Sequence, residues 1–349
     1  MAYELEEAKK LVVAAGKKLV ESGLIARTWG NVSARISDTQ FVITPSGRAY
    51  ETLTPEEVVV VNIEDCSYEG DIKPSSEKGV HAAAYRHHPT VDFVIHTHQK
   101  AATIVSITGM EIRNVYKEFQ PVLGTKVPCA DYAMSTTNSL RKKVETCIMM
   151  NPGCRAIMLM HHGTLCMGDT YEQAFEIADA LEKCCQRVIK DNYLRHSWAK
   201  TYSDEGKRNF YLKKNGAVAM PESICDLGSS VRNGKTFSLT VGGETVDVDL
   251  ETGLGITGIA PKCAKIHKAI YDSQDCSIIK HVTDPDVIAV SCTGEDMIPM
   301  IDDFAQIAGV DVKNRPWIDG DTDACAKDIA KAMDSRNAIL IQGNGAMIT

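Results

Sequence analysis

The 349-residue sequence contains no long apolar run, no basic stretch and no closely spaced set of cysteines. A helix that crosses a membrane needs about 20 consecutive apolar residues, and no segment of this chain provides them. Residues 1–22 show a charged helical pattern without the apolar centre of a signal peptide. The formal net charge of −8 disfavours nucleic acid and anionic membranes as partners. These absences predict a cytoplasmic protein that binds neither membranes nor nucleic acids.

The 12 cysteines are scattered along the chain, and two of them, Cys184 and Cys185, are adjacent. In a chain of this length, such a pattern is typical of reduced thiols in the cytosol rather than of a disulfide scaffold. Hydrophobic residues make up 44% of the sequence and charged residues 24%, which is a globular composition. The length exceeds that of one ordinary domain, so two domains or one large domain are expected.

Strand-like segments and helical patterns are interleaved along the first part of the chain. Residues 4–22 predict an amphipathic helix that stops at Gly23. Residues 31–36 and 40–44 predict two strands that are close enough to pair as a hairpin. Further strands are expected at 58–63, 93–98 and 156–160, and further helices after 74–77, from 101, and at 139–150 and 171–193. This mixture predicts an α/β fold with a partly antiparallel sheet, not a doubly wound one.

The later part of the chain repeats the earlier part. Segment 267–294 carries similar residues in the same order as segment 81–109. Segment 338–345 matches segment 156–163 in the same way. The separation between the copies stays nearly constant. A period of this length indicates duplication of a domain. The alternative is a pair of unrelated α/β segments that share apolar strands.

A change in composition at residues 213–236 marks a linker between the two copies. We therefore predict one domain at 1–214 and a degenerate second copy at 215–349. The second copy is expected to be incomplete. The chain stops at Thr349, directly after the strand that would match 156–160, whereas a long helix follows that strand in the first copy.

Three histidines near strand ends form a candidate metal site. His96 and His98 end an apolar strand, and residues two apart on a strand share one face. His162 follows another apolar strand. Three imidazoles with one open position make a catalytic zinc site. A single His-x-His pair is more often a surface or packing feature, but a second histidine pair at another strand end favours the metal.

The second copy lacks both histidine pairs. Its segment 280–283 reads Lys-His-Val-Thr, and its segment 343–345 reads Gly-Asn-Gly. If the histidines served only packing, the two sets need not change together. Their joint loss indicates that one copy kept a metal while the other became structural.

The Pro-Ser-Ser-Glu segment 74–77 places two hydroxyls and a carboxylate at a predicted helix start. It is either an ordinary helix cap or a phosphate site, with Glu77 beside a cation as general base. Segments 28–33 and 44–47 also combine glycines with small polar side chains. Each is an ordinary turn by itself, but together the three loops provide an uncharged cradle for an anion.

The ordered set of these motifs resembles the class II aldolase/adducin-head family. It comprises Gly-Asn-Val-Ser at 30–33, Thr-Pro-Ser-Gly at 44–47, Pro-Ser-Ser-Glu at 74–77, His-Thr-His at 96–98 and His-His-Gly at 161–163. The resemblance covers about residues 5–210, and residues 215–349 match only as a degenerate second copy. It implies a three-layer α/β/α sandwich around a mostly antiparallel sheet, and homo-oligomers with sites near subunit interfaces.

The resemblance also assigns roles to individual residues. It makes His96, His98 and His162 ligands of Zn2+ or another divalent metal, and Glu77 the catalytic carboxylate. Tyr116 matches a family tyrosine that enters a neighbouring subunit's site as proton donor, once a one-residue gap is placed after His98. The substrate phosphate would lie among Thr28, Gly30, Asn31, Ser46, Gly47, Ser75 and Ser76. Arg27 and Trp29 depart from the small residues of the family at that loop.

The implied activity is metal-dependent cleavage of a small ketose 1-phosphate into dihydroxyacetone phosphate and an aldehyde, through an enediolate. Two sister reactions use the same base and metal: epimerisation of a pentulose phosphate and dehydration of a methylthioribulose phosphate. Epimerases of the family tend to carry Asp where Glu77 stands, which favours the aldolase. A non-catalytic adducin-like scaffold is the remaining alternative, and the intact histidines argue against it.

Overall fold

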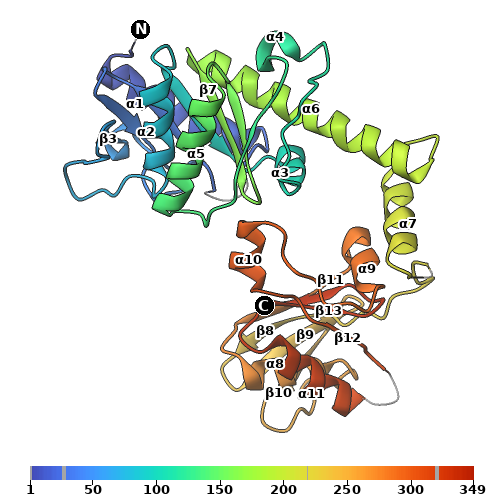
Figure 1. Cartoon of the computed structure of the whole chain (residues 1–349). Coiled ribbons are helices and arrows are strands. Elements are labelled where there is room, and N and C mark those ends of the chain that lie inside the picture. Colours follow the sequence, from blue (N-terminus) through green and yellow to red (C-terminus); the bar gives the residue numbers. More distant parts are fainter. Residues whose placement is uncertain (1, 26–28, 218, 319–321) are drawn as a thin grey trace. The chain divides into compact units, whose positions relative to one another are not determined.

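The computed structural model describes residues 2–25, 29–217, 219–318 and 322–349, and the chain divides into two compact units (Figure 1). The first unit spans Met1–Asn192 and the second spans Tyr193–Thr349. The helix α7 (Asp204–Lys214) precedes the sequence boundary that we placed at 214, yet it belongs to the second unit. Its Arg208 Nη1 lies 3.0 Å from Asp286 Oδ1, on the helix α9 (Pro285–Ser291) of that unit.

The first unit is built on a seven-stranded sheet in the order β3-β2-β1-β4-β7-β6-β5. Neighbouring strands are antiparallel except β5 and β6, which are parallel. The strands are β1 (Asn31–Arg35), β2 (Gln40–Ile43), β3 (Val59–Asn62), β4 (Phe93–Thr97), β5 (Cys129–Ala130), β6 (Ala156–Leu159) and β7 (Gly163–Gly168). The predicted mostly antiparallel sheet is confirmed.

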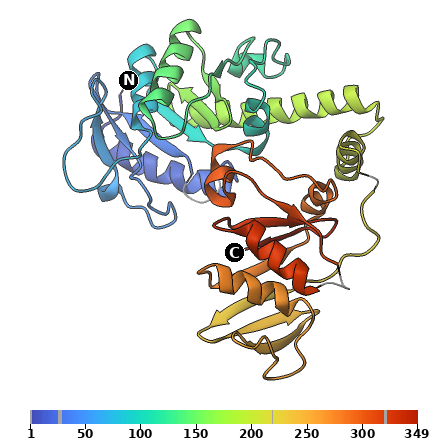
Figure 2. The same ribbon diagram turned by 60° about the horizontal axis from the view of Figure 1, so that its bottom comes forward.

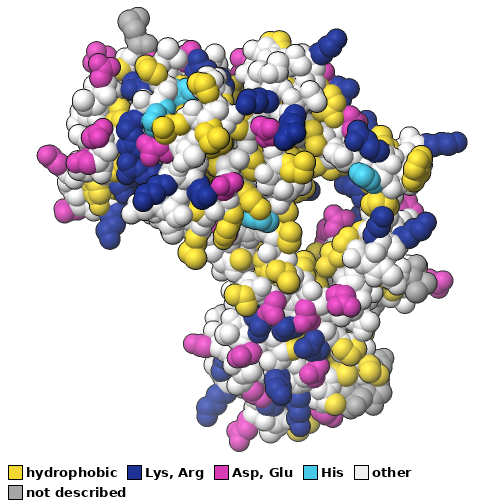
Figure 3. All heavy atoms as spheres, in the orientation of Figure 1, with side chains coloured by type: hydrophobic (Ala, Val, Ile, Leu, Met, Phe, Trp, Pro, Cys, Tyr) yellow, Lys and Arg dark blue, Asp and Glu magenta, His cyan; other side chains and the backbone are white. Residues whose placement is uncertain are grey.

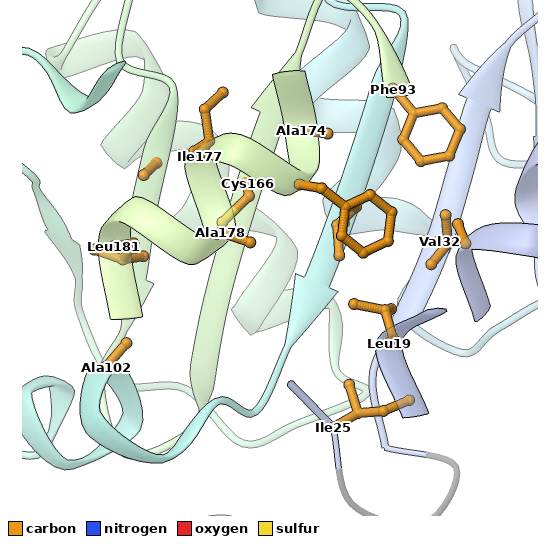
Figure 4. Packing of buried hydrophobic residues seen from close by; sticks show 14 of the residues in the cluster. Leu19, Ile25, Val32, Phe93, Ala102, Cys166, Ala174, Ile177, Ala178 and Leu181 are labelled. Atoms are coloured by element: carbon orange, nitrogen blue, oxygen red, sulfur yellow. The ribbon is translucent and has the colours of Figure 1, made fainter. Parts of the chain in front are cut away.

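Helices cover both faces of this sheet. The helices are α1 (Leu5–Glu21), α2 (Lys78–His87), α3 (Lys100–Ser106), α4 (Gln120–Leu123), α5 (Asn138–Met150) and α6 (Tyr171–Ser197), with a 3-10 turn at Pro55–Glu57. One apolar cluster joins α1, α3 and α6 to the sheet, and Figure 4 shows Leu19, Phe93 and Leu181 within it. The other cluster lies under α2 and α5. The predicted α/β/α sandwich is therefore confirmed.

The second unit repeats this sheet. Its strand order is β10-β9-β8-β11-β14-β13-β12, and again only the last pair is parallel. The strands are β8 (Ser229–Asn233), β9 (Thr236–Val241), β10 (Glu244–Asp249), β11 (Ile278–Val282), β12 (Asn314–Arg315), β13 (Ala338–Ile341) and β14 (Ala346–Ile348). The order and directions match the first sheet strand for strand, as duplication requires.

Two helices pack together on one face of the second sheet. These are α8 (Ala264–Ser273) and α11 (Thr322–Met333), which lie side by side in Figure 2 and share a core with the strands. A smaller cluster on the other face involves α9 and α10 (Asp302–Ala308). Acidic and basic side chains are interspersed on the face of this unit seen in Figure 3.

The expectation that the chain stops directly after the strand matching 156–160 was wrong. The strand β14 follows β13 and pairs with β11, just as β7 pairs with β4. It is only three residues long and follows a Gly-Asn-Gly turn, so it has too few alternating residues to be recognised in the sequence. The second sheet thus has all seven strands, and the element without a counterpart after it is α6.

No helix within the described residues is long and apolar enough to cross a membrane.

Candidate metal centre and phosphate loops

The structure brings the three histidines together. His96 lies on β4 opposite Leu165 of β7, His98 follows β4, and His162 lies in the turn between β6 and β7. The Nε2 atom of His96 is 2.9 Å from Nε2 of His98 and 3.2 Å from Nε2 of His162. One ligand nitrogen from each ring lies within 4.8 Å of the others. The antiparallel pairing of β4 with β7 is what joins these two distant segments.

A backbone carbonyl fixes the protonation of His96. The Nδ1 atom of His96 lies 2.8 Å from the carbonyl oxygen of Thr164. A carbonyl only accepts hydrogen bonds, so Nδ1 carries the proton and Nε2 of the neutral ring has a free lone pair. That lone pair points into the histidine cluster. Such a carbonyl contact is how proteins orient a metal-binding imidazole.

Gly163 permits the close approach of these strands. A Cβ at this position would lie 2.4 Å from the carbonyl oxygen of Thr97 and 3.4 Å from His96 Cε1. Any larger residue would push β7 away from β4 and separate His162 from His96. The glycine of the His-His-Gly motif therefore has a steric role in the site.

Glu77 lies against the cluster and is 9% exposed. Its Oε2 is 3.1 Å from His96 Nε2, and its Oε1 is 3.1 Å from His162 Nε2. Burial acts to raise the pKa of the Glu77 carboxyl, but the adjacent rings of His96 and His162 outweigh it and hold that pKa well below its ordinary value. Asn31 Nδ2 also donates to Oε2 at 3.1 Å. The carboxylate is thus kept ionised beside the imidazoles.

The donor set fits a divalent cation. Two imidazole nitrogens 2.9 Å apart need a shared proton or a cation between them, because their lone pairs repel. Within the described residues, the buried Oε1 atom of Glu77 has no partner that meets hydrogen-bond geometry. Three neutral imidazoles with a carboxylate at hand are the ligands of catalytic zinc sites, which keep a further position for substrate.

The helix α2 follows the Pro-Ser-Ser-Glu segment, as predicted. It starts at Lys78, and Glu77 is its N-cap residue rather than part of the first turn. Ser75 Oγ accepts a hydrogen bond from the Glu77 backbone N–H at 3.3 Å. The Ser75 hydroxyl therefore helps to hold the backbone of the residue whose carboxylate meets the histidines.

The loops predicted to hold phosphate lie side by side where the structure describes them. Pro45 bridges to Pro74, and the Ser75 backbone N–H donates to the Thr44 carbonyl at 3.0 Å. Ser75 is buried, whereas Ser46, Gly47 and Ser76 are exposed. Thr28 lies outside the described residues.

Gly30 brings the preceding loop against the metal strand. Its φ is +108°, and a Cβ there would lie 2.7 Å from the carbonyl oxygen of His96. Only glycine combines this backbone conformation with that approach. The Tyr50 hydroxyl donates to the Gly30 carbonyl at 2.6 Å, which holds the loop in place. Tyr50 was not foreseen from the sequence, since a lone aromatic after a turn carries no functional signal.

Tyr116 is held by α6. Its hydroxyl donates to Asp191 Oδ2 at 2.8 Å, and the Arg187 guanidinium lies 4.2 Å from its ring centre. Burial and the hydrogen bond to the Asp191 carboxylate raise the pKa of Tyr116 to about 12. Among the described residues these partners are on α6, so the structure of one chain does not bring Tyr116 to the histidines.

The second unit has a different set of residues at the matching place. The strand registers align His281 with His96, although we had compared segment 280–283 only as a whole. Its Nδ1 accepts from the Leu227 backbone N–H at 3.1 Å, and its Nε2 lies 2.7 Å from the Asn344 carbonyl. Both ring nitrogens are therefore used by the backbone. Asn344, which takes the place of His162, bonds the N–H and the carbonyl of Cys225 at 2.8 and 2.9 Å.

Comparison with curated proteins finds sugar-phosphate enzymes. A 5-deoxy-D-ribulose 1-phosphate aldolase of Bacillus thuringiensis serovar kurstaki is 32% identical over 183 residues, covering 52% of this chain and 84% of the relative. The L-fuculose phosphate aldolase of Escherichia coli strain K12 is 33% identical over 172 residues, covering 49% and 78%. An L-ribulose-5-phosphate 4-epimerase of Salmonella paratyphi C is 31% identical over 199 residues, covering 51% and 82%.

The fold and the family agree with these relatives. A solved structure of L-fuculose 1-phosphate aldolase aligns with 60% of this chain and 96% of its own, with a TM-score of 0.50 and 27% identity. The family model described as "Class II Aldolase and Adducin N-terminal domain" matches residues 10–189 and 233–349, so it covers both units. The chain therefore belongs to the class II aldolase and adducin N-terminal domain family.

Proposed function

We propose that the first unit is a metal-dependent aldolase that cleaves a ketose 1-phosphate into dihydroxyacetone phosphate and an aldehyde. The observation that carries this proposal is the convergence of His96, His98 and His162 beside the buried carboxylate of Glu77. The similarity to two sugar-phosphate aldolases supports the substrate class.

The three imidazoles would hold the metal, for which zinc is our proposal. A bound divalent cation supplies Lewis-acid polarisation of the substrate's carbonyl oxygen. His96 is already oriented for this by the carbonyl of Thr164, which holds its Nδ1 proton. No lysine Schiff base is needed for the same chemistry.

Glu77 would move the proton at C3. In the cleavage direction, the C4 hydroxyl passes its proton to solvent through Tyr116 as the C3–C4 bond breaks and the aldehyde forms, and Glu77, once it has taken a proton from solvent, delivers it to C3 of the enediolate. In the condensation direction, the Glu77 carboxylate removes that proton. Its ionised resting state suits a base. Ser46, Gly47, Ser75 and Ser76, with Gly30, Asn31 and Thr28, would hold the phosphate.

Tyr116 would act in a neighbouring copy of the chain, as proton donor to the aldehyde oxygen. This requires a homo-oligomer with sites close to subunit interfaces, and release of the Tyr116 hydroxyl from Asp191. Size measurement by light scattering tests the oligomer. A protein that stays monomeric at working concentrations, yet keeps full activity, would remove Tyr116 from the mechanism.

The test is incubation of purified protein with a panel of ketose 1-phosphates, with detection of dihydroxyacetone phosphate. Release of dihydroxyacetone phosphate supports the aldolase. Loss of this release with a chelator, and its recovery with Zn2+, would show that the reaction requires the metal. The second candidate is a pentulose-phosphate 4-epimerase, favoured by the 31% identity to such an enzyme. Conversion of L-ribulose 5-phosphate to its epimer, without release of dihydroxyacetone phosphate, would decide for it. Protein that binds no metal and stays inactive on every substrate after Zn2+ is added would indicate a scaffold.

A further inference from the structure

A chain of buried hydrogen bonds leads away from Glu77 into the first unit. Asn31 Nδ2 donates to Glu77 Oε2 at 3.1 Å, and Asn31 Oδ1 lies 2.5 Å from His81 Nε2. His81 Nδ1 lies 2.6 Å from Ser33 Oγ, which is 2.7 Å from the Tyr85 hydroxyl. His81 and Ser33 are fully buried. The proposed mechanism has no use yet for His81, Ser33 or Tyr85.

The second unit contains the same three side chains without the carboxylate. Ser230 Oγ lies 2.7 Å from His267 Nδ1 and 2.8 Å from the Tyr271 hydroxyl. His267 Nε2 lies 2.7 Å from the carbonyl oxygen of Leu227. Gly228 stands where the first unit has Asn31. The histidine therefore meets a backbone carbonyl in one unit and a side-chain amide in the other.

The second unit shows which ring nitrogen carries the proton. The Leu227 carbonyl can only accept, so His267 is protonated at Nε2, and Ser230 then donates to Nδ1. The first unit has the same serine and tyrosine around His81. Within the described residues, Tyr85 has only the Ser33 hydroxyl as partner for its own, so Tyr85 donates to Ser33 and Ser33 donates to His81 Nδ1. His81 is protonated at Nε2 as well.

This direction settles the orientation of Asn31. Because His81 Nε2–H donates to it, the Asn31 oxygen faces the imidazole and its NH2 group faces Glu77. Without that donor, the amide has no reason to keep this orientation, and its oxygen would repel the Glu77 carboxylate if it turned. The hydrogen bonds run one way, from Tyr85 through His81 to Glu77.

We propose that His81 is a positioning residue, which fixes the amide of Asn31 so that its N–H holds Glu77 Oε2 beside the histidine cluster. The inference rests on the proposed function, since it assigns a rate effect to the orientation of Glu77. The competing explanation is that His81 only ties α2 to β1, as His267 ties α8 to β8 in the second unit.

The experiment compares matched variants in the two units. Two substitutions of His81 differ in reach: His81→Gln keeps a donor near the place of Nε2, whereas His81→Asn keeps a polar group only near the place of Nδ1. We expect His81→Asn to lower the rate of C3 proton exchange of dihydroxyacetone phosphate by about tenfold or more at unchanged metal content, and His81→Gln to recover most of it. His267→Asn should lower thermal stability to a similar extent but leave the rate unchanged.

Equal rates for His81→Asn and wild type, or equal effects of His81→Asn and His267→Asn on the rate, would overturn the proposal. So would a His81→Gln variant as slow as His81→Asn. A wild-type protein without any exchange or cleavage activity would instead refute the proposed function.

A measurement on metal-free protein distinguishes failure of this inference from failure of the proposed function, because it requires no activity. Nitrogen-15 NMR of the wild-type imidazoles should show both His81 and His267 protonated at Nε2. The side-chain amide signals of Asn31 should shift in His81→Asn and not in His267→Asn. A proton on Nδ1 of His81 would overturn the inference whatever the activity.

Discussion

The two units share one strand order and differ in the residues at matching positions of the fold. Where the first unit has His98, His162 and Glu77, the second has Thr283, Asn344 and Cys263. The hydrogen-bonded ladder is kept in both, including the parallel pair at one edge. Backbone pairing therefore does not depend on the metal residues, which can be lost without loss of the sheet.

The faces of the two sheets differ as well. Phe93 on β4 is fully buried in the cluster with α1 and α6, whereas Ile278, at the matching end of β11, is 45% exposed. Lys280 takes the place of buried Ile95. In the first unit, α1 and α6 cover this face of the sheet. In the second unit, the matching face carries exposed side chains such as Ile278 and Lys280. Each unit keeps its Ser-His-Tyr triad, so this buried contact forms with or without the metal residues beside it.

The largest expected effect is on the metal. His162→Ala should abolish stoichiometric metal binding and reduce aldolase activity by roughly a thousandfold or more, because the Lewis acid supplies several kcal/mol of charge stabilisation. Asn344→Ala is the matched variant, and it should leave metal content and activity unchanged. Elemental analysis and a coupled assay measure both. Metal retained by His162→Ala at full occupancy would contradict the assignment of this ligand.

Glu77→Gln should separate metal binding from proton transfer. We expect normal metal content and a loss of C3 proton exchange of about 100- to 10,000-fold, because a general base is removed. Cys263→Ser in the second unit is the control and should exchange protons at the wild-type rate. If the glutamine variant exchanged as fast as wild type, Glu77 would not be the base.

Because the two sheet faces differ in burial, truncating a side chain on each should lower the free energy of unfolding by different amounts. Phe93→Ala should destabilise the first unit by about 3–5 kcal/mol, because it leaves a cavity under α6. Ile278→Ala should cost less than about 1 kcal/mol, because the side chain is half exposed. Hydrogen exchange of amides within each unit measures the two values separately. Equal costs would show that the face of the second sheet is covered in solution.

The buried histidines of the two triads predict a smaller, pH-dependent effect. Burial lowers the pKa of His81 to about 3 and that of His267 to about 4. Both are below the ordinary histidine value, so the unfolded chain binds more protons than the folded one. Stability is fully present above about pH 6.5 and is lost as the pH falls toward the folded pKa values.

The slope should be roughly 1.4 kcal/mol per pH unit for each histidine. Denaturant unfolding of metal-free protein between about pH 7 and pH 5 measures it, with His81→Gln and His267→Gln as the paired variants. Each substitution should reduce the slope of its own unit only. An unchanged slope in the substituted unit would assign it to other groups, such as His88, whose pKa burial also lowers.

Much of this architecture could be predicted from the sequence, because its motifs lie at the ends of strands. The apolar runs before His96 and His162 identify β4 and β6, and the repeated segments identify the duplication. The start of α2 at Lys78 agrees with the helix predicted after segment 74–77. The strand β14 was missed because three residues after a glycine turn give no pattern.

Other features depend on contacts between distant segments, which the sequence alone does not specify. His81 and Tyr85 fall in the repeated segment 81–109, but their bonds to Ser33 require β1 to lie beneath α2, which no local pattern encodes. The role of Thr164 depends on the register of β4 with β7, and one residue of slip would place another carbonyl at His96.

The clamp of Asn344 on Cys225 has a consequence for attempts to revive the second unit. Replacing Thr283, Asn344 and Cys263 with the side chains of the first unit would remove this clamp, but His281 Nδ1 would still accept from the Leu227 N–H, so the proton of the neutral ring would stay on Nε2, the atom that faces the cluster in His96. A working second centre would require the stretch from Cys225 to Leu227 to be rebuilt as well. Restoring side chains alone would leave the His281 ring in the wrong tautomer, because the main chain at Leu227 sets it.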